Sequence, residues 1–196
     1  MSLSEPRSGT VQRWAWDFVL STTLEAKLAP PPVPDATDAW EENAPVRRLV
    51  APGRPPELRI VTKAAKTRGL NSPHGRARAL HTFLHHELQA AELMAWAVLA
   101  FPDTPVEFRS GLVRIALDEI RHMHMYAKEI RRLGHEVGAF TVRDWFWDVF
   151  RAAPTRSRSS RRWVSASRAP ALSTPRLSQP RFARRETRKA RASRSA

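Results

Sequence analysis

Residues 106–134 read VEFRSGLVRIALDEIRHMHMYAKEIRRLG, and this stretch decides the fold. Its apolar side chains recur three and four positions apart, which is typical of one face of an α-helix. Gly134 is a typical C-terminal stop, because glycine readily adopts the left-handed conformation that ends many helices. The stretch therefore predicts one long amphipathic helix.

A second long helix precedes it, over residues 71–101. Asn71 and Ser72 are candidate N-terminal caps, and Pro102 ends the apolar pattern. Two long helices joined by a turn as short as PDTP pack antiparallel. The sequence predicts an all-α fold built on this helical hairpin.

Each helix carries a stripe of seven residues at heptad-like spacing. In the first helix the stripe comprises Leu80, Leu84, Glu87, Ala91, Met94, Val98 and Phe101. In the second helix it comprises Phe108, Leu112, Ile115, Glu119, His122, Tyr126 and Leu133, with Glu129 between the last two. Apart from Glu129 near the helix end, the polar members are Glu87 in one helix and the pair Glu119 and His122 in the other.

These three polar residues are the candidate metal ligands. If the chain turns near Asp103, Glu87 lies opposite Glu119, and His122 lies opposite Leu84, one turn away. Buried carboxylates that face each other repel, and a cation between them removes the repulsion. Carboxylate oxygens and an imidazole nitrogen suit iron, manganese or zinc. The alternative is a polar patch bridged by water.

Other polar residues of the hairpin give weaker candidates. Glu92 is the alternative carboxylate, and His81 and His85 could form an isolated zinc clip. Solvent-facing positions are the commoner role for such histidines. His86 and His124 fit either supporting positions beside the metal or the surface.

The sequence divides into four parts. Residues 1–28 contain an amphipathic helix over 10–28, and residues 29–75 form a proline-rich connector that either wraps the domain or is mobile. Residues 76–150 hold the hairpin and an aromatic anchor. Its residues Trp145, Phe146 and Trp147 fit a core better than a platform that stacks nucleic-acid bases.

The fourth part, residues 151–196, is basic and low in complexity. It holds 14 of the 33 Lys and Arg residues and only one acid, Glu186. Such a composition predicts disorder. It could bind RNA or DNA electrostatically, although a solvated coil is the simpler interpretation.

Composition excludes several classes of function. The chain has no cysteine, so disulfides and thiolate chemistry are excluded. No apolar run approaches 18 residues, and the start MSLSEPRSGT is polar, so neither a membrane span nor a signal peptide is expected. A cytoplasmic protein with no membrane partner is the expectation.

Three segments carry a resemblance to a known family: HHELQAAELMAWAVLAFPD, ALDEIRHMHMYAKEIRRLG and VRDWFWDVF. The chain resembles the ferritin-like di-iron carboxylate proteins, which combine a Glu on one helix with Glu-x-x-His on another. More narrowly, residues 10–150 look like a bacterial ferritin-like family of unknown function. The resemblance implies Glu87, Glu119 and His122 as ligands, iron as cofactor, and oxidation or hydroxylation of an unidentified substrate.

The chain departs from that pattern after about residue 155, because a second helix pair with its own Glu and Glu-x-x-His is missing. A DNA sequence that encodes Ser159–Arg168 encodes Phe-Val-Ala-Ala-Met-Gly-Leu-Gly-Phe-Glu when it is read one nucleotide earlier, which suggests a frameshift. A homodimer could rebuild a four-helix site. The alternatives are a basic nucleic-acid-binding protein that is not an enzyme, or a nonfunctional gene fragment.

Overall fold

A computed structural model describes residues 3–35, 38–63 and 69–152 of the chain. Its helices are α1 (Val11–Leu20), α2 (Leu24–Leu28), α3 (Pro73–Ala100), α4 (Val106–Arg132) and α5 (Trp145–Ala152). Within the described ranges the only β pairing is a parallel bridge between Ile60 and Val142. The all-α expectation is thus confirmed. The predicted disorder of residues 151–196 falls almost wholly outside the described residues.

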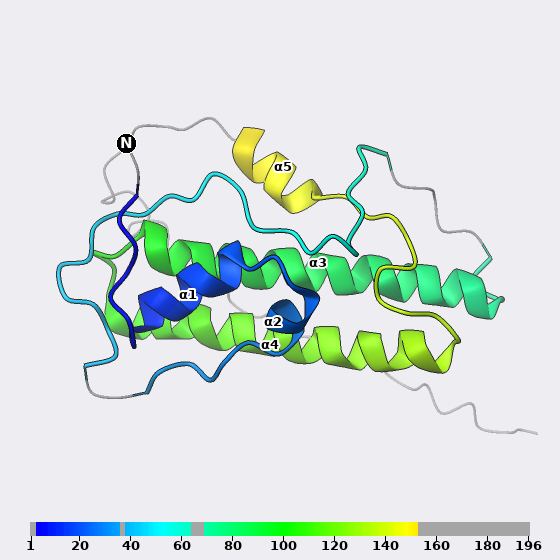
Figure 1. Cartoon of the computed structure of the whole chain (residues 1–196), viewed down its shortest axis with the longest axis horizontal. Coiled ribbons are helices and arrows are strands. Elements are labelled where there is room, and N and C mark those ends of the chain that lie inside the picture. Colours follow the sequence, from blue (N-terminus) through cyan, green and yellow to red (C-terminus); the bar gives the residue numbers. More distant parts are fainter. Residues whose placement is uncertain (1–2, 36–37, 64–68, 153–196) are drawn as a thin grey trace, which may run out of the picture. The chain divides into compact units, whose positions relative to one another are not determined.

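The two long helices α3 and α4 form an antiparallel pair (Figure 1). The Ser72 side chain caps α3 by accepting a hydrogen bond of 3.0 Å from the Gly75 N–H. Gly134, with φ of 81°, ends α4, and its N–H donates to the carbonyl of Arg131 at 2.9 Å. Both ends of the hairpin that the sequence predicted are confirmed.

The buried seam between the helices follows the predicted stripe of α3 in part and departs from the predicted stripe of α4. In α4 the buried residues are Val113, Ala116, Ile120, Met123, Ala127 and Ile130. In α3 the buried heptad residues are Leu84, Leu88, Ala91, Ala95 and Val98. Both rows are wholly apolar, whereas the predicted stripe of α4 is interrupted by Glu119 and His122. Burying the uninterrupted rows avoids the desolvation of charged groups, so the α4 seam lies one residue further along.

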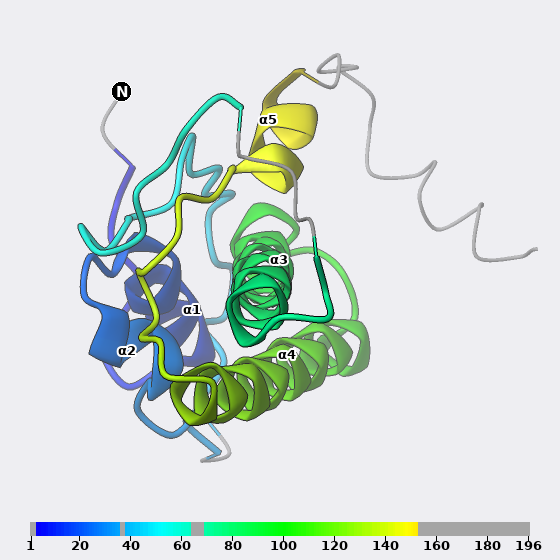
Figure 2. The same ribbon diagram turned by 90° about the vertical axis from the view of Figure 1, so that its right-hand side faces the viewer.

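The N-terminal segment forms two helices, so the prediction of one helix over residues 10–28 is wrong. The α1 helix ends at Leu20, and α2 starts after Thr23, whose side chain accepts a hydrogen bond of 3.3 Å from the Ala26 N–H. Thr23 is therefore the N-cap of a separate helix, and its extended backbone prevents α1 from continuing into α2. The two short helices lie on one side of the hairpin (Figure 2).

The described part of the proline-rich connector packs against α1 and α3, in line with the first of the two alternatives that the sequence left open. The Trp96 indole donates to the carbonyl of Leu49 at 2.9 Å, and the Gly53 N–H donates to the carbonyl of Val19 at 2.9 Å. A side chain at Gly53 would collide with the backbone of Leu20, with its Cβ 2.1 Å from the carbonyl oxygen. The connector therefore passes directly over the C-terminal end of α1.

A buried ionic network ties α2, the connector and α3 together. Lys27 and Glu92 are both 0% exposed, and Lys27 Nζ lies 2.8 Å from Glu92 Oε1. The Arg54 guanidinium forms salt bridges with Glu92 and with Asp144, and Arg54 Nε lies 2.9 Å from Asp144 Oδ1. Burial lowers the pKa of Lys27, and the charge of Glu92 partly offsets that effect.

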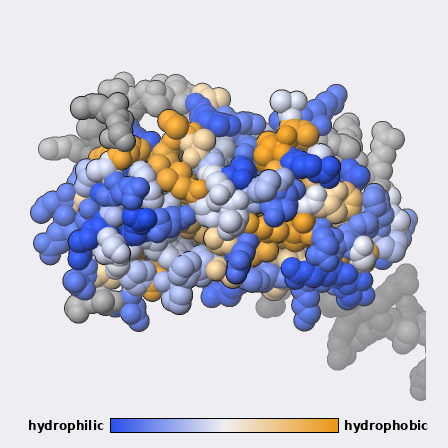
Figure 3. Space-filling model, viewed as in Figure 1, coloured by the Kyte–Doolittle hydropathy of each residue, from blue (hydrophilic) through white to orange (hydrophobic). Residues whose placement is uncertain are grey.

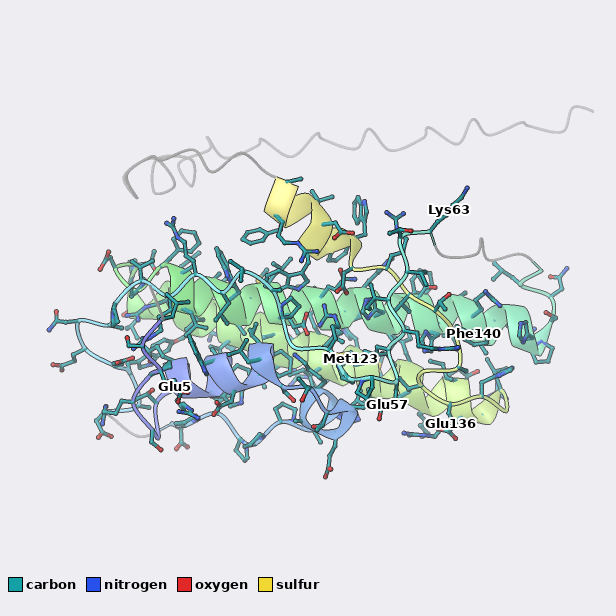
Figure 4. The ribbon with its side chains drawn as sticks, turned by 45° about the horizontal axis from the view of Figure 1, so that its top comes forward. Glu5, Glu57, Lys63, Met123, Glu136 and Phe140 are labelled. Carbon is teal, nitrogen blue, oxygen red and sulfur yellow. The ribbon has the colours of Figure 1, made fainter. Side chains whose placement is uncertain are left out.

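The segment after α4 closes over the hairpin. Phe140 lies near the end of the hairpin where α3 begins and α4 ends, and its ring meets those of His74, His81 and His135 (Figure 4).

Trp147 of α5 is fully buried, whereas Trp145 is 49% exposed, so the predicted aromatic anchor is correct for Trp147 and wrong for Trp145.

Apolar residues also reach the surface. On the face that carries α1 and α2, Figure 3 shows them as separate patches among polar residues. No helix in the described part of the chain combines the length and hydropathy needed to cross a membrane.

Candidate metal centre

The structure brings together the three residues that the sequence selected as ligands. Glu87 of α3 and Glu119 and His122 of α4 each offer a ligand atom, and these atoms lie within 4.8 Å of one another. His122 Nδ1 and Glu119 Oε2 are 2.9 Å apart. The i, i+3 spacing places Glu119 and His122 on the same side of α4, facing the end of the Glu87 side chain.

The cluster is not buried as the sequence predicted. The His122 side chain is 47% exposed and that of Glu119 is 20% exposed. The reason is the position of the buried seam, which contains Leu88 and Ile120, the residues that follow Glu87 and Glu119. The cluster therefore lies along the edge of the helix pair, open to solvent on one side.

The electrostatics of the cluster favour an added positive charge. Burial, the hydrogen bond with Glu119 and the charge of Glu119, in decreasing order of effect, together raise the pKa of Glu87 to about 7. The nearby His122 acts in the opposite direction. Near neutral pH a fraction of Glu87 is thus protonated, and a bound cation would take the place of that proton.

Apolar side chains surround the cluster along the same edge of the hairpin. We call this surface the open flank, and its apolar members are Leu80, Phe83, Met94, Leu112, Ile115 and Tyr126. Phe83 and Tyr126 meet across the two helices, with ring centroids 6.1 Å apart. In the end-on view of the hairpin, α1 and α2 lie on one side of it and α5 lies above α3 (Figure 2). At 100° per residue, the Glu87 stripe points away from the α3 face that holds Leu88 and Glu92.

His81 and His85 occupy positions that the sequence did not predict. Both are buried, so the expectation that they face solvent is wrong. His81 Nε2 accepts a hydrogen bond of 2.7 Å from the Gly138 N–H, and His85 Nε2 lies 3.0 Å from Asp144 Oδ1. A zinc clip that used these two Nε2 atoms is therefore excluded.

The hydrogen bond of His85 helps to hold Asp144 ionised. Burial opposes that charge, but the His85 hydrogen bond and the Arg54 guanidinium together lower the pKa of Asp144. The partners of these histidines come from segments more than 50 residues away in sequence, so local spacing could not reveal them.

Glu92 does not belong to the candidate metal centre. Its Oε1 contacts Lys27 and Arg54, and its Oε2 accepts a hydrogen bond of 2.9 Å from the Trp147 indole. Both oxygens are thus committed to protein cations and donors. The alternative ligand set with Glu92 is wrong.

A small pocket lies elsewhere on α3, beside α5. Its volume is about 290 Å³, and its lining residues are Thr82, His85, His86, Val142, Arg143 and Trp145. The His86 ring stacks on that of Phe146, with centroids 5.3 Å apart. The pocket shares no residue with the cluster of Glu87, Glu119 and His122, and His124 is exposed and belongs to neither.

The fold and the cluster together define an α-helical protein with carboxylate and imidazole groups gathered between two long helices. The chain belongs to the family described as Protein of unknown function (DUF455), which it matches over residues 15–165. That match includes α2 to α5 entirely and most of α1. Neither a curated protein nor a solved structure matches the chain.

Proposed function

We propose that the protein binds a transition-metal ion through Glu87, Glu119 and His122. The observation that carries this proposal is the convergence of three ligand atoms within 4.8 Å from two different helices. Two carboxylates at this distance repel when both are ionised, and this repulsion adds to the larger effect of burial in raising the pKa of Glu87. A divalent cation would turn the same arrangement into a favourable one.

The donor set suits iron best, with manganese or zinc as alternatives. Two carboxylate oxygens and one imidazole nitrogen are typical ligands of Fe(II), and they leave open coordination positions. In the single chain those positions face the exposed side of the cluster and are open to further ligands. Iron bound in such a set supplies the ability to activate dioxygen, so we propose oxidation or hydroxylation as the reaction class, in line with the resemblance to ferritin-like proteins.

Each of the three residues has a distinct role in this proposal. Glu119 and Glu87 supply negative charge from opposite helices and so fix the ion between α3 and α4. His122 supplies a neutral nitrogen, and its short contact with Glu119 holds the ring at the cluster. A ligand histidine is oriented by a hydrogen bond from its second ring nitrogen, so that nitrogen would donate to a nearby acceptor.

Metal content of the purified chain tests the proposal. Elemental analysis of the wild type should find iron, manganese or zinc, and Glu119→Ala should lose most of that metal. Glu107→Ala is the matched control, because Glu107 is an exposed glutamate of the same helix. Negligible metal in the wild type after growth in iron-, manganese- and zinc-supplemented medium, or equal metal in all three proteins, would overturn the proposal.

The expectations for the basic tail fall almost wholly outside the described residues. Nucleic-acid binding through residues 151–196, which the sequence did not favour over a solvated coil, stays untested, and a shifted reading frame beneath residues 156–196 stays a prediction. The family match continues to residue 165 and thus into this part of the chain. The nucleotide sequence tests the second prediction, which requires a helix-coding frame that contains a Glu codon beneath the tail.

A further inference from the structure

We propose that the open flank binds the same flank of a second copy of this chain, and that the two copies together close one metal site. The proposal rests on the proposed function of Glu87, Glu119 and His122. It adds the partner that completes their site. Three features of the described residues support it: the apolar surface, the incomplete ligand set and the charge of the cluster.

Exposed apolar side chains lie beside the cluster on both helices. Phe83 is 49% exposed and Ile115 is 45% exposed, one turn before Glu87 and Glu119 respectively. Phe108, at the start of the same stripe of α4, is 53% exposed. Contiguous apolar side chains of this size on both helices are typical of a surface that binds another protein.

The helices also carry more apolar rows than the hairpin uses. In α4 one row forms the seam with α3, and a second row, which contains Leu112, Ile115 and Tyr126, lies beside it on the open flank. A helix with two adjacent apolar rows contacts two neighbours in a bundle, whereas a simple hairpin needs only one row. The second apolar row of α4 thus favours packing against another helix besides α3.

The basic segment that follows α5 does not have the composition to be that neighbour. Residues 153–196 contain no histidine and only one acid, Glu186, so they cannot supply a matching ligand set. Their large apolar residues are few: Trp163, Val164, Leu172, Leu177 and Phe182. A second copy supplies both things that the flank lacks, because it carries the same apolar row and the same three ligands.

A two-fold axis that passes beside the cluster would bring the two flanks together. Such an interface is isologous, so each flank meets an identical surface. Two hairpins joined in this way make a four-helix arrangement whose centre holds four carboxylates and two imidazoles. Four carboxylates repel one another, and two divalent cations carry the charge that balances them. Dimer formation and metal binding should therefore promote each other.

The test measures the mass of the full chain in solution with and without metal. In sedimentation equilibrium the wild type with iron(II) under anaerobic conditions should have twice the chain mass of 22.3 kDa, and excess chelator should shift it toward the monomer. Ile115→Lys should weaken dimerisation at least tenfold and lower the metal retained per chain. Val149→Lys is the matched control, since Val149 is a 52% exposed apolar residue on α5.

The outcomes separate this proposal from the proposed function. A wild type that binds metal as a monomer overturns the dimer and leaves the metal site in place. A dimer that persists in Ile115→Lys also overturns the proposal, because its interface lies elsewhere. If the wild type contains no metal in any sample, both the proposed function and the metal site shared between two copies are contradicted.

A second measurement uses the absence of cysteine from the chain. A single Ile115→Cys variant can carry one nitroxide label per chain. Loading the site with Zn(II), which has no unpaired electron, ensures that any dipolar coupling comes from labels on two copies. The expected distance between labels is short at position 115 and longer for Val149→Cys. No coupling at position 115 would overturn the proposed interface.

Discussion

Glu87 carries a stability cost in the metal-free protein. Its pKa of about 7 lies above the ordinary value of 4.5, so the folded state holds a proton that the unfolded state releases. Stability is therefore lost as the pH rises from about 4.5 through 7. The cost reflects the position of the side chain between Glu119 and the apolar flank.

We predict that Glu87→Gln stabilises the metal-free protein at pH 8. The gain should be about 1 kcal/mol, a value that allows for solvent screening of a partly exposed group. The gain should shrink as the pH falls toward 4.5, where the wild-type carboxyl is neutral as well. Urea unfolding in the presence of chelator measures it, with Glu107→Gln as a control that should not gain. An equal or lower stability of Glu87→Gln at pH 8 would contradict the prediction.

His81 makes the stability of the protein fall as the pH falls, which is the opposite of the effect of Glu87. Burial lowers the pKa of His81 from 6.5 to about 4, and the charges of His85, Arg59 and Arg78 act in the same direction. The unfolded state binds the proton first, so stability is present above pH 6.5 and is lost as the pH falls toward 4.

We predict that His81→Gln makes the stability of the protein less dependent on pH. The glutamine carbonyl can still accept a hydrogen bond from the Gly138 N–H but does not titrate. Between pH 6.5 and 4 the wild type should lose up to about 3 kcal/mol more than the variant. Denaturant unfolding at several pH values measures the difference, and His124→Gln serves as the exposed control. Parallel stability curves for wild type and His81→Gln would contradict the prediction, because they would mean that folding does not lower the pKa of His81.

At the scale of the elements, the hairpin was predictable because its ends are determined locally. Ser72 starts α3 through its side-chain hydroxyl, whereas Pro102 and Gly134 mark helix ends through their backbone conformation, and the structure confirms all three. The register of the seam was not predictable from one stripe alone. Two rows in each helix satisfy heptad spacing, and only a comparison of their polar content shows that the row of Ile120 and Met123 is the one to bury.

The elements that surround the hairpin were harder to predict. The break between α1 and α2 depends on Thr23, and the amphipathic pattern continues across it. The burial of Lys27 depends on Glu92 and on backbone carbonyls of Phe18 and Val19, which accept hydrogen bonds of 2.7 Å and 2.9 Å from its ammonium group. Pairing over long sequence separations leaves no periodic pattern in the sequence.

We predict that Lys27→Met destabilises the protein by about 3 kcal/mol, because the change removes one partner of a buried ion pair and leaves part of the charge of Glu92 unbalanced. Lys63→Met is the matched control, since Lys63 extends away from the helices into solvent (Figure 4). Thermal or urea unfolding at pH 7 compares the two variants with the wild type. A similar stability for both variants would mean that the ionic network does not hold α2 against α3.

At the scale of the whole molecule, charge is segregated along the chain. The 150 residues before the basic segment hold 18 of the 19 acids. All three residues of the candidate metal centre also lie within these 150 residues. The sequence revealed this division by counting alone. It could not reveal that the connector, α1 and α5 leave one edge of the hairpin to the apolar flank, because that depends on how segments far apart in sequence pack.

The separation of the buried seam from the ligand stripe has an evolutionary consequence. Since the residues that hold α3 to α4 are not those that would hold an ion, a lineage could lose Glu87, Glu119 or His122 and still produce a folded protein. Selection for folding alone would not preserve the ligands. Their retention or loss among relatives would report on use of the ion, independently of the constraint that keeps the hairpin intact.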